Sequence, residues 1–568
     1  MNWIVALLLL SSCTLFKKNN EKAHGHSQLY SDPETDNAVS ISSNEKRLVI
    51  VATHDLKGRL EAHQVKVEDV HSPEKTLISV GGLEVFARYL EILRETYPSE
   101  VVLVDSGNSI AGSFLARESR GNAIFATYEQ MKYDAVSLAA PDLSAGPKLK
   151  TSAPANKWLP EIIKRYETPL VTSNLIDLKT TRPVEWGKST PQLLKEINGV
   201  KVGFVSLFPD DLPKKLGAGV LNGLYIEPAI QALLKQTRAL RLKGANVIIM
   251  TMYGGLKCGH ERALKKNIPV SKVNFDPKDP SACDLDSPLG KFLQEIPPGS
   301  VDVVITGGAT NKVANFVNGI PVIQAFNDGN SFARVDLVWH TRDNAIVTEK
   351  TLIHQPTRLC HRFFKKTEDC YTEDTSVDHR EQIPARYLNQ LIFPEPATAQ
   401  WMNTWRDILA QNMGPILFNE KNFEPTQELA EAILNSTAAD VSLVGGKSWS
   451  LRFPAGRIGW REIFKQKSAR ENIQLIQLSG SELNQIKEAL TDKHWWAYPG
   501  NWDDLILESE VTLAVNAQLW NRIVTLTQLS KEVELADFIV ADTIVTWQQD
   551  SVSARASGRS PALPHTQP

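Results

Sequence analysis

The sequence predicts an α/β fold arranged in two domains. Short apolar runs with strand character alternate with segments whose apolar residues recur at helical spacing, over about residues 46–345. At 568 residues, the chain is longer than one hydrophobic core normally accommodates. Polar clusters follow several predicted strands, at the edge where open α/β sheets place their ligand sites. A large layered domain that carries a site, followed by a smaller domain, is therefore expected.

The alternation can be followed along the first domain. The apolar residues between Leu83 and Leu93 share one helical face, and a second helix is predicted at about residues 230–240. Strands are predicted at residues 47–53, 101–104, 200–207, 246–250, 301–305 and 321–324.

The remaining chain divides by composition. Residues 346–395 show little periodicity and are predicted to be a connector. Residues 396–548 begin with a helix at about 397–411 and form a second α/β or α+β domain. Residues 549–568 are rich in Ser, Pro and Arg, so we expect a disordered tail.

Charge argues against a nucleic-acid partner, and hydropathy argues against a membrane-spanning helix. Lys and Arg number 62 against 65 Asp and Glu, which gives a net charge of −3 and no footprint for nucleic acid. Beyond the first residues, no apolar stretch is long enough to cross a bilayer.

The N-terminus predicts export to a bacterial cell envelope. A short apolar core precedes Leu10-Ser11-Ser12-Cys13, which resembles a lipobox with Cys13 as the lipidated residue. We expect residues 1–13 to be a lipoprotein signal peptide and residues 14–45 to be a polar tether. No Asp follows Cys13, which favours an anchor in the outer membrane, facing the periplasm. An ordinary signal sequence or a misassigned start codon is the alternative, since the core lacks a preceding Lys or Arg.

Four further cysteines indicate disulfides, because an even count in an exported chain usually pairs. We pair them by closeness, Cys258 with Cys283 and Cys360 with Cys370. The other two connectivities stay open.

The polar clusters carry motifs that resemble a known family. The chain resembles the calcineurin-like metallophosphoesterases and, within them, the bacterial 5'-nucleotidases, over roughly residues 46–545. The resemblance implies a four-layer αββα N-terminal domain and a smaller α/β (α+β) 5'-nucleotidase C-terminal domain. The motifs that carry it are Thr53-His54-Asp55-Leu56-Lys57-Gly58-Arg59, Asp105-Ser106-Gly107-Asn108, Tyr133-Asp134-Ala135 and Gly307-Gly308-Ala309-Thr310.

The resemblance implies seven metal-ligand side chains, of which only Asp55 and Asp105 remain as a remnant metal site. Pro141 and Ser144 occupy the positions of the catalytic His–Asp dyad. Two metals would bind phosphate and generate hydroxide in active relatives, so we expect no metal cofactor here. The five degenerate ligand positions are Asn108, Ala140, Met252, Gly308 and Thr310.

These losses predict a catalytically inactive envelope protein that binds a ligand or a protein partner. The expected partners are a nucleotide or phosphate ligand, the membrane through the lipid anchor, and an envelope protein. Lys57, Arg59, Asn108 and the Gly307-Gly308 backbone offer donors for phosphate. An active metal-dependent phosphoesterase acting on nucleotides or related esters is the alternative.

Lys57 has a specific interpretation. Without metals, Asp55 and Asp105 would crowd one partly buried cleft, which is electrostatically costly. We therefore interpret Lys57 as a metal-replacing residue whose ammonium neutralises both carboxylates. The alternative is that Lys57 points to solvent, as most lysines do.

The second half continues the resemblance. The strand 439–443 precedes a glycine loop in which Ser450 occupies the position of a substrate-gripping Arg. An aromatic residue that would stack on a nucleobase is replaced by Arg470, while two tryptophans offer a second aromatic surface. A tryptophan cluster is more often core or interface. The possible ligand-binding residues are Gly445, Gly446, Arg452, Arg470, Trp495 and Trp496.

Overall fold

The fold is seen in a computed structural model. It describes residues 40–67, 76–110, 112–113, 115–116, 119–144, 154–216, 219–259, 282–308, 312–371, 377–378, 380–411, 417–419, 427–437, 439–445, 456–458, 472–490, 494–531, 533–539 and 566–567.

Two sheets form the centre of the N-terminal domain. The first has the strand order β18-β17-β1-β4-β5-β6-β9, and β19 pairs with β17 outside this path. Its strands are β1 (Glu45–Thr53), β4 (Val101–Asp105), β5 (Ala135–Val136), β6 (Leu170–Val171), β9 (Ser189–Thr190), β17 (Ser331–His340), β18 (Ala345–Ile346) and β19 (Leu352–Arg358). The second has the order β10-β11-β13-β14-β16-β15, with β10 (Leu193–Ile197), β11 (Val200–Leu207), β13 (Val247–Tyr253), β14 (Val303–Gly307), β15 (Val313–Val317) and β16 (Ile320–Gln324).

The side-chain alternation of β1 explains why the sheets stack. Leu48 and Ile50 pack against residues of the second sheet, in a core that contains Val202 and Ile249. Val49, on the other face of β1, packs against helix residues instead. Because both faces of the strand are apolar, the sheet is covered on both sides.

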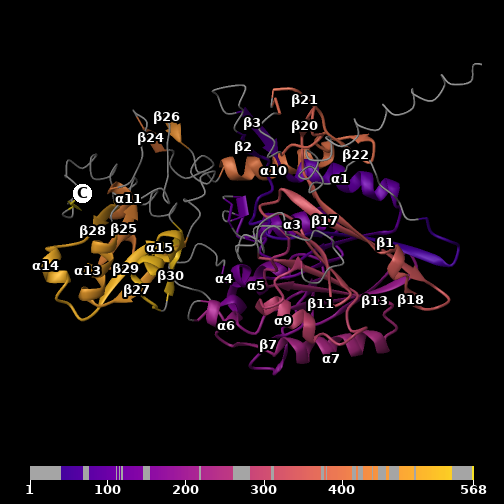
Figure 1. Cartoon of the computed structure of the whole chain (residues 1–568), viewed down its shortest axis with the longest axis horizontal. Coiled ribbons are helices and arrows are strands. Elements are labelled where there is room, and N and C mark those ends of the chain that lie inside the picture. The colour runs from indigo at the N-terminus through magenta and orange to yellow at the C-terminus, as the bar shows by residue number, and fades with distance from the viewer. Residues whose placement is uncertain are drawn as a thin grey trace, which may run out of the picture.

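Helices cover the two outer faces. The helices α1 (Leu83–Thr96), α3 (Asn122–Gln130) and α5 (Ala155–Ile163) share a core with the first sheet. The helices α7 (Ala229–Leu242) and α9 (Pro288–Glu295) share a core with the second. The resulting order, helix, sheet, sheet, helix, confirms the predicted four-layer α/β domain (Figure 1).

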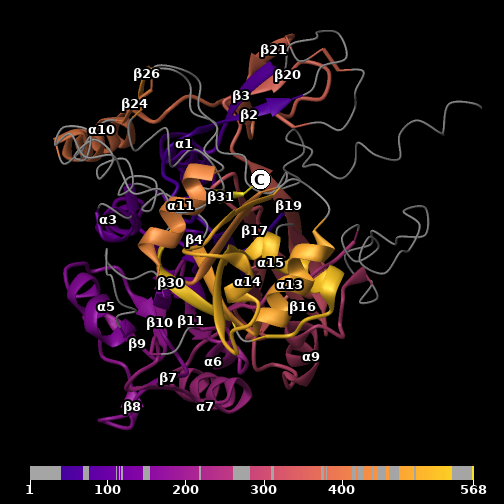
Figure 2. The same cartoon turned by 90° about the vertical axis from the view of Figure 1, so that its left-hand side faces the viewer.

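The C-terminal domain has its own sheet, core and helices, beside the first domain in Figure 1 and in front of it in Figure 2. Its strand order is β30-β27-β29-β25-β28-β31. The strands are β25 (Val441–Gly445), β27 (Asn472–Leu478), β28 (His494–Ala497), β29 (Val511–Asn516), β30 (Val533–Ile539) and β31 (Thr566–Gln567). The helices are α11 (Gln427–Ser436), α13 (Gly480–Ala489), α14 (Trp502–Leu505) and α15 (Ala517–Thr527).

Local chemistry explains how strand β27 is followed by a turn and helix α13. Ser479 accepts a hydrogen bond from the Glu482 amide while the Glu482 side chain accepts one from the Ser479 amide. This capping box starts α13 directly after β27.

The segment between the domains is partly built into the first. Strand β19 extends the first sheet, so the expected connector contributes to that domain. The helix α10 (Pro396–Gln411), expected at 397–411, packs Met402 into the core that contains α1. At the other end of the chain, two residues of the expected tail form β31, and residues 540–565 lie outside the described part.

The remaining elements are small. They are β2 (His63–Val67), β3 (Thr76–Val80), α4 (Ala140–Ser144), β7 (Leu175–Asp177), β8 (Arg182–Pro183), α6 (Leu212–Lys215), β12 (Leu224–Ile226), η4 (Thr348–Lys350), β20 (Arg362–Phe364), β21 (Gln382–Pro384), β22 (Arg386–Tyr387), β23 (Gln390–Leu391), β24 (Leu417–Asn419) and β26 (Gly456–Ile458).

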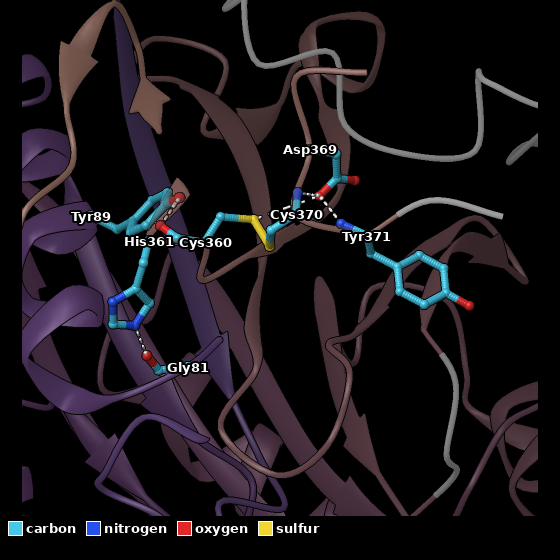
Figure 3. The surroundings of a disulfide bond; sticks show 7 residues. All are labelled: Gly81, Tyr89, Cys360, His361, Asp369, Cys370 and Tyr371. Carbon is cyan, nitrogen blue, oxygen red and sulfur yellow. Dashed lines mark hydrogen bonds between the residues drawn. A yellow bond between two sulfur atoms is a disulfide. The ribbon is translucent and has the colours of Figure 1, made fainter. Parts of the chain in front are cut away.

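Both predicted disulfides are confirmed, Cys258 with Cys283 and Cys360 with Cys370. The second links the end of β19 to the loop that follows β20. Figure 3 shows its surroundings, where the Tyr89 hydroxyl of α1 donates to the carbonyl of Cys360 at 3.4 Å. Among the described residues, no helix is both long and apolar enough to span a bilayer.

Candidate functional site

The site forms where the carboxyl ends of four strands meet. Thr53 of β1 pairs with Asp105 of β4, and Tyr253 of β13 pairs with Gly307 of β14. The polar residues that follow these strands therefore converge from both sheets. Asp55 lies at the centre, 2% exposed, with a φ of 48° that is uncommon for a residue other than glycine.

The carboxylate of Asp55 is surrounded by hydrogen-bond donors. The Tyr253 hydroxyl lies 2.7 Å from its Oδ1 atom, and the Asn108 amide nitrogen also donates to Oδ1. On the other side, Oδ2 accepts from the Gly308 amide at 2.9 Å and lies 2.7 Å from Nδ1 of His54. Both carboxylate oxygens are thus engaged by the protein.

His54 supplies the positive charge of this arrangement. It is 1% exposed, and its Nε2 atom lies 2.9 Å from the carbonyl oxygen of Ala325. A carbonyl can only accept, so Nε2 carries a proton, and Nδ1 faces a carboxylate that also favours a proton. We therefore infer an imidazolium cation paired with the Asp55 carboxylate. Burial raises the pKa of Asp55, but the hydrogen bond and charge of His54 and the bonds from Tyr253 and Gly308 outweigh it, so the pKa is lowered.

The ring of Tyr253 lies over a glycine pair. A Cβ atom at Gly307 would lie 2.9 Å from Cδ2 of Tyr253, and one at Gly308 would lie 2.9 Å from Cε1. Only residues without a side chain leave this room. The Tyr253 hydroxyl also lies 2.7 Å from the amide nitrogen of Asn108. Burial and the nearby Asp55 raise the pKa of Tyr253, so its hydroxyl keeps its proton and donates.

Asp105 occupies a separate, completely buried environment. Its described partners are neutral: the hydroxyls of Thr53 at 2.7 Å, Ser109 at 3.0 Å and Tyr128 at 3.1 Å, and the Gly107 amide at 2.9 Å. Burial raises the pKa of Asp105 to about 7 despite these bonds. The two carboxylates expected to share a remnant metal site therefore have different partners. The side chain of the second motif that contacts Asp55 is Asn108, which the prediction assigned as degenerate.

Asp142, which the sequence reasoning did not single out, holds the loop after β4 against the start of α4. Its carboxylate accepts the amides of Asn108 at 2.6 Å, Ser109 and Ile110 at 2.9 Å, and Ala139 at 2.8 Å. Burial raises the pKa of Asp142 to about 6, although these amides lower it. The sequence signal that could have revealed Asp142 is its place two residues after Ala140, a degenerate ligand position.

The interpretation of Lys57 as the metal-replacing residue needs correction. Its Nζ atom lies 3.4 Å from Asp328, whose other oxygen lies 3.9 Å from Arg59. Asp55 and Asp105 accept their hydrogen bonds from other residues. The cation beside Asp55 is His54, which directly precedes it in the sequence and was overlooked because the resemblance places no ligand there.

The assignment of Met252 as a degenerate ligand position in the site also needs correction. It is 3% exposed and packs in the core beneath the second sheet with Leu207 and Leu256. The next residue, Tyr253, points into the site because successive side chains of a strand face opposite ways. An apolar Met followed by Tyr at the end of a buried strand could have indicated this register.

The dyad positions lie on the short helix α4. Ser144 is exposed, and its hydroxyl donates to the carbonyls of Ala140 at 3.3 Å and Pro141 at 3.2 Å. Ala140 is half-buried and Pro141 is exposed at the start of this helix. None of these three side chains contributes an imidazole or a carboxylate.

In the C-terminal domain, the structure describes only some of the predicted ligand-binding residues, and these lie in different surroundings. Trp496 is 7% exposed and belongs to the core, with its ring 5.1 Å from that of Trp502. Trp495 is half-buried, and Gly445 ends β25. Cys13, Thr310, Gly446, Arg452 and Arg470 lie outside the described residues.

The donor set around Asp55 does not fit a two-metal centre. Metals need several deprotonated nitrogen or oxygen ligands, whereas both nitrogens of His54 are engaged and Asn108 turns its NH₂ group inward. In the described part, the group with metal-ligating spacing is Cys360, Asp369 and Cys370, whose cysteines form a disulfide.

Solved structures of known proteins share this architecture. A candidate 5'-nucleotidase from Staphylococcus aureus has a TM-score of 0.56 at 13% identity, covering 89% of this chain and 97% of its own. The 5'-nucleotidase precursor of Thermus thermophilus has a TM-score of 0.53 at 13% identity, covering 89% of this chain and 96% of its own.

The chain has the 5'-nucleotidase fold.

The NAD nucleotidase of Haemophilus influenzae shares this 5'-nucleotidase fold, with a TM-score of 0.53 at 15% identity, and covers 89% of this chain and 96% of its own. At sequence identities this low, the similarity shows a shared fold and nothing further. No family model matches the sequence. A cell wall protein of Listeria monocytogenes is 22% identical over 321 residues, which is 53% of this chain and 38% of that protein. The chain thus spans about two fifths of the length of that relative.

Proposed function

We propose that this protein is a non-catalytic envelope protein that keeps the 5'-nucleotidase fold to bind a ligand or a protein partner. The observation that carries the proposal is the Tyr253 hydroxyl, 2.7 Å from both Asp55 and the Asn108 amide nitrogen. A metal-bridging carboxylate must offer free lone pairs, and here neutral donors and His54 take them. The Gly307 and Gly308 backbone, over which the Tyr253 ring lies, completes this replacement.

The envelope location belongs to the same proposal. The similarity to a cell wall protein supports association with an envelope, and the lipobox-like segment ending at Cys13 supports a lipid anchor in the outer membrane. Mass spectrometry of the mature N-terminus tests the anchor. An unmodified N-terminus produced by cleavage elsewhere would contradict it.

Metal content and hydrolysis test the catalytic part. The purified protein is analysed for bound metals and assayed with a panel of nucleotides in the presence of Mn²⁺ or Zn²⁺. The Asp55→Asn variant is the matched control, because it abolishes metal chemistry at this site and leaves any contaminating phosphatase unchanged. We expect substoichiometric metal and equal, background hydrolysis in both proteins. Two bound metals with hydrolysis that disappears in Asp55→Asn would overturn the proposal.

A further inference from the structure

The outer side of helix α7 carries a row of apolar and basic side chains. Leu234, Arg238 and Leu242 follow one another at four-residue spacing, which places them on one side of the helix. Leu234 is 40% exposed and Leu242 is 81% exposed, and Arg238 between them is exposed as well. The helix lies at the lower edge of the molecule in both Figure 1 and Figure 2. Within the described part of the chain, this row therefore faces solvent.

The charge of α7 is positive. The helix contains Lys235, Arg238 and Arg241 and no acidic residue. Lys235 pairs with Glu227 at 3.5 Å, and Arg241 pairs with Asp302 at 2.6 Å. Arg238 makes no ion pair with any residue that the structure describes. The cation between the two exposed leucines is therefore available to an external anion.

The chain enters the fold beside the C-terminal end of α7. The carbonyl of Asn44 accepts hydrogen bonds from the amide of Thr341 at 2.8 Å and from its hydroxyl at 2.9 Å. In the same turn between β17 and β18, the side-chain oxygen of Asn344 accepts from the side chain of Asn246 at 3.1 Å. Asn246 follows the end of α7 by four residues. The segment that precedes Asn44 thus leaves the domain near the exposed row.

Further cations gather at this end of the helix, where the helix dipole favours positive charge. They are the exposed residues Lys201, Lys243 and Arg342. A Cβ atom at Gly244 would lie only 3.4 Å from the Nζ atom of Lys201. Of the nearby acids, Asp343 pairs with His340 at 2.8 Å, and Glu196 lies opposite Lys201 in the pairing of β10 with β11. The balance at this end of α7 remains positive.

We propose that the exposed row of α7 lies on the headgroup surface of an anionic lipid bilayer. The two leucines would enter the boundary between headgroups and acyl chains, and Arg238 with the cations at the helix end would contact lipid phosphates. A symmetric contact between two copies of this chain would instead bring like charges together, which is unfavourable. The inference rests on the envelope location in the proposed function, but it does not require the lipid anchor.

Co-sedimentation of the full chain with vesicles tests this surface. Cys13→Ser is the background for every variant, because it keeps the lipid anchor out of the measurement. The vesicles contain phosphatidylethanolamine and phosphatidylglycerol, and phosphatidylcholine alone is the neutral reference. We expect binding to the anionic vesicles that weakens as salt is added. Arg238→Glu should lower the partition constant by at least about tenfold, and Leu242→Ser by about tenfold.

Matched controls change the same residue types away from α7. Lys365→Glu alters a lysine that is 65% exposed in the segment between the domains, and Leu507→Ser alters a leucine that is 84% exposed in the C-terminal domain. Both should bind the anionic vesicles as the Cys13→Ser background does. All four substitutions lie at exposed positions, and circular dichroism confirms that each variant is folded.

Two results would overturn the proposal. One is equal binding by all variants or by both kinds of vesicle, because the charge and the leucines of α7 would then play no part. The other is a dimer that Leu242→Ser dissociates without any vesicle binding, which would assign the surface to a second copy of the chain. Metal content, hydrolysis at Asp55 and the mass of the mature N-terminus do not enter this measurement. The surface and the proposed function therefore fail separately.

Discussion

The hydroxyl of Tyr253, at the end of β13, donates to the carboxylate of Asp55, at the end of β1, across 2.7 Å. This bond joins the carboxyl edges of the two central sheets, at the position where the sequence resemblance implies a metal site. The predictions below follow from it and from the neighbouring buried charges.

Tyr253→Phe removes the hydroxyl and keeps the ring over Gly307 and Gly308. Asp55 and Asn108 each lose a buried partner, so we expect the free energy of unfolding to fall by about 1–3 kcal/mol. Denaturant titration measures it. Tyr225→Phe is the control, because Tyr225 is 49% exposed and should change stability by less than about 0.5 kcal/mol. Equal stability of the two variants would show that the bond is not formed.

His54→Gln removes the cation beside the buried Asp55. An uncompensated buried charge costs about 3–5 kcal/mol, and we expect Asp55→Asn to recover part of that loss in the double variant. His340→Gln is the control, because its partner Asp343 is 76% exposed and such surface pairs contribute about 0–1 kcal/mol. The pairing would be contradicted if the double variant lost more unfolding free energy than the two single variants lose together.

Asp105 should make the protein less stable as the pH rises. Its folded pKa of about 7 lies above the ordinary 3.8, so the folded state retains a proton that the unfolded state releases. Stability is therefore full below the ordinary value and is lost between about pH 4 and 7, by an amount on the order of a few kcal/mol. The measurement is chemical denaturation across this range. Asp105→Asn should reduce the slope and leave the part that Asp142, with a pKa raised to about 6, contributes at lower pH, whereas an unchanged slope would rule out Asp105 as a source.

Lys57→Met distinguishes the two candidate cations. The pair with Asp328 is partly exposed, at 33% and 26%, so its loss should cost only about 0–1 kcal/mol. Thermal unfolding at neutral pH compares this variant with His54→Gln. A larger effect of Lys57→Met would restore the interpretation in which the lysine replaces the metal charge.

Much of the fold could be predicted from the sequence because the spacing of apolar residues indicates which faces of strands and helices are buried. The alternation of β1, with Leu48 and Val49 on opposite faces, predicts a sheet covered on both sides. The two disulfides followed from chain proximity. The connector was less predictable, since β19 pairs with the distant β17, and such pairing leaves no local pattern in sequence.

The site was harder to predict because it depends on side-chain direction. One position along β13 separates Met252 in the core from Tyr253 in the site, and gapless motif matching does not resolve that step. His54 was missed for a different reason: its role requires the carbonyl of Ala325, which is remote in sequence. Motif positions located Asp55, but its neutralising partners come from the ends of separate strands.

The contact between Tyr253 and Gly308 makes these two positions depend on each other. A side chain at 308 and the tyrosine ring would compete for one volume, since a Cβ there would already lie 2.9 Å from the ring. Enlarging position 308 alone would produce a clash, and shortening position 253 alone would leave a void. Any change in the chemistry of this pocket therefore requires paired substitutions on two neighbouring strands.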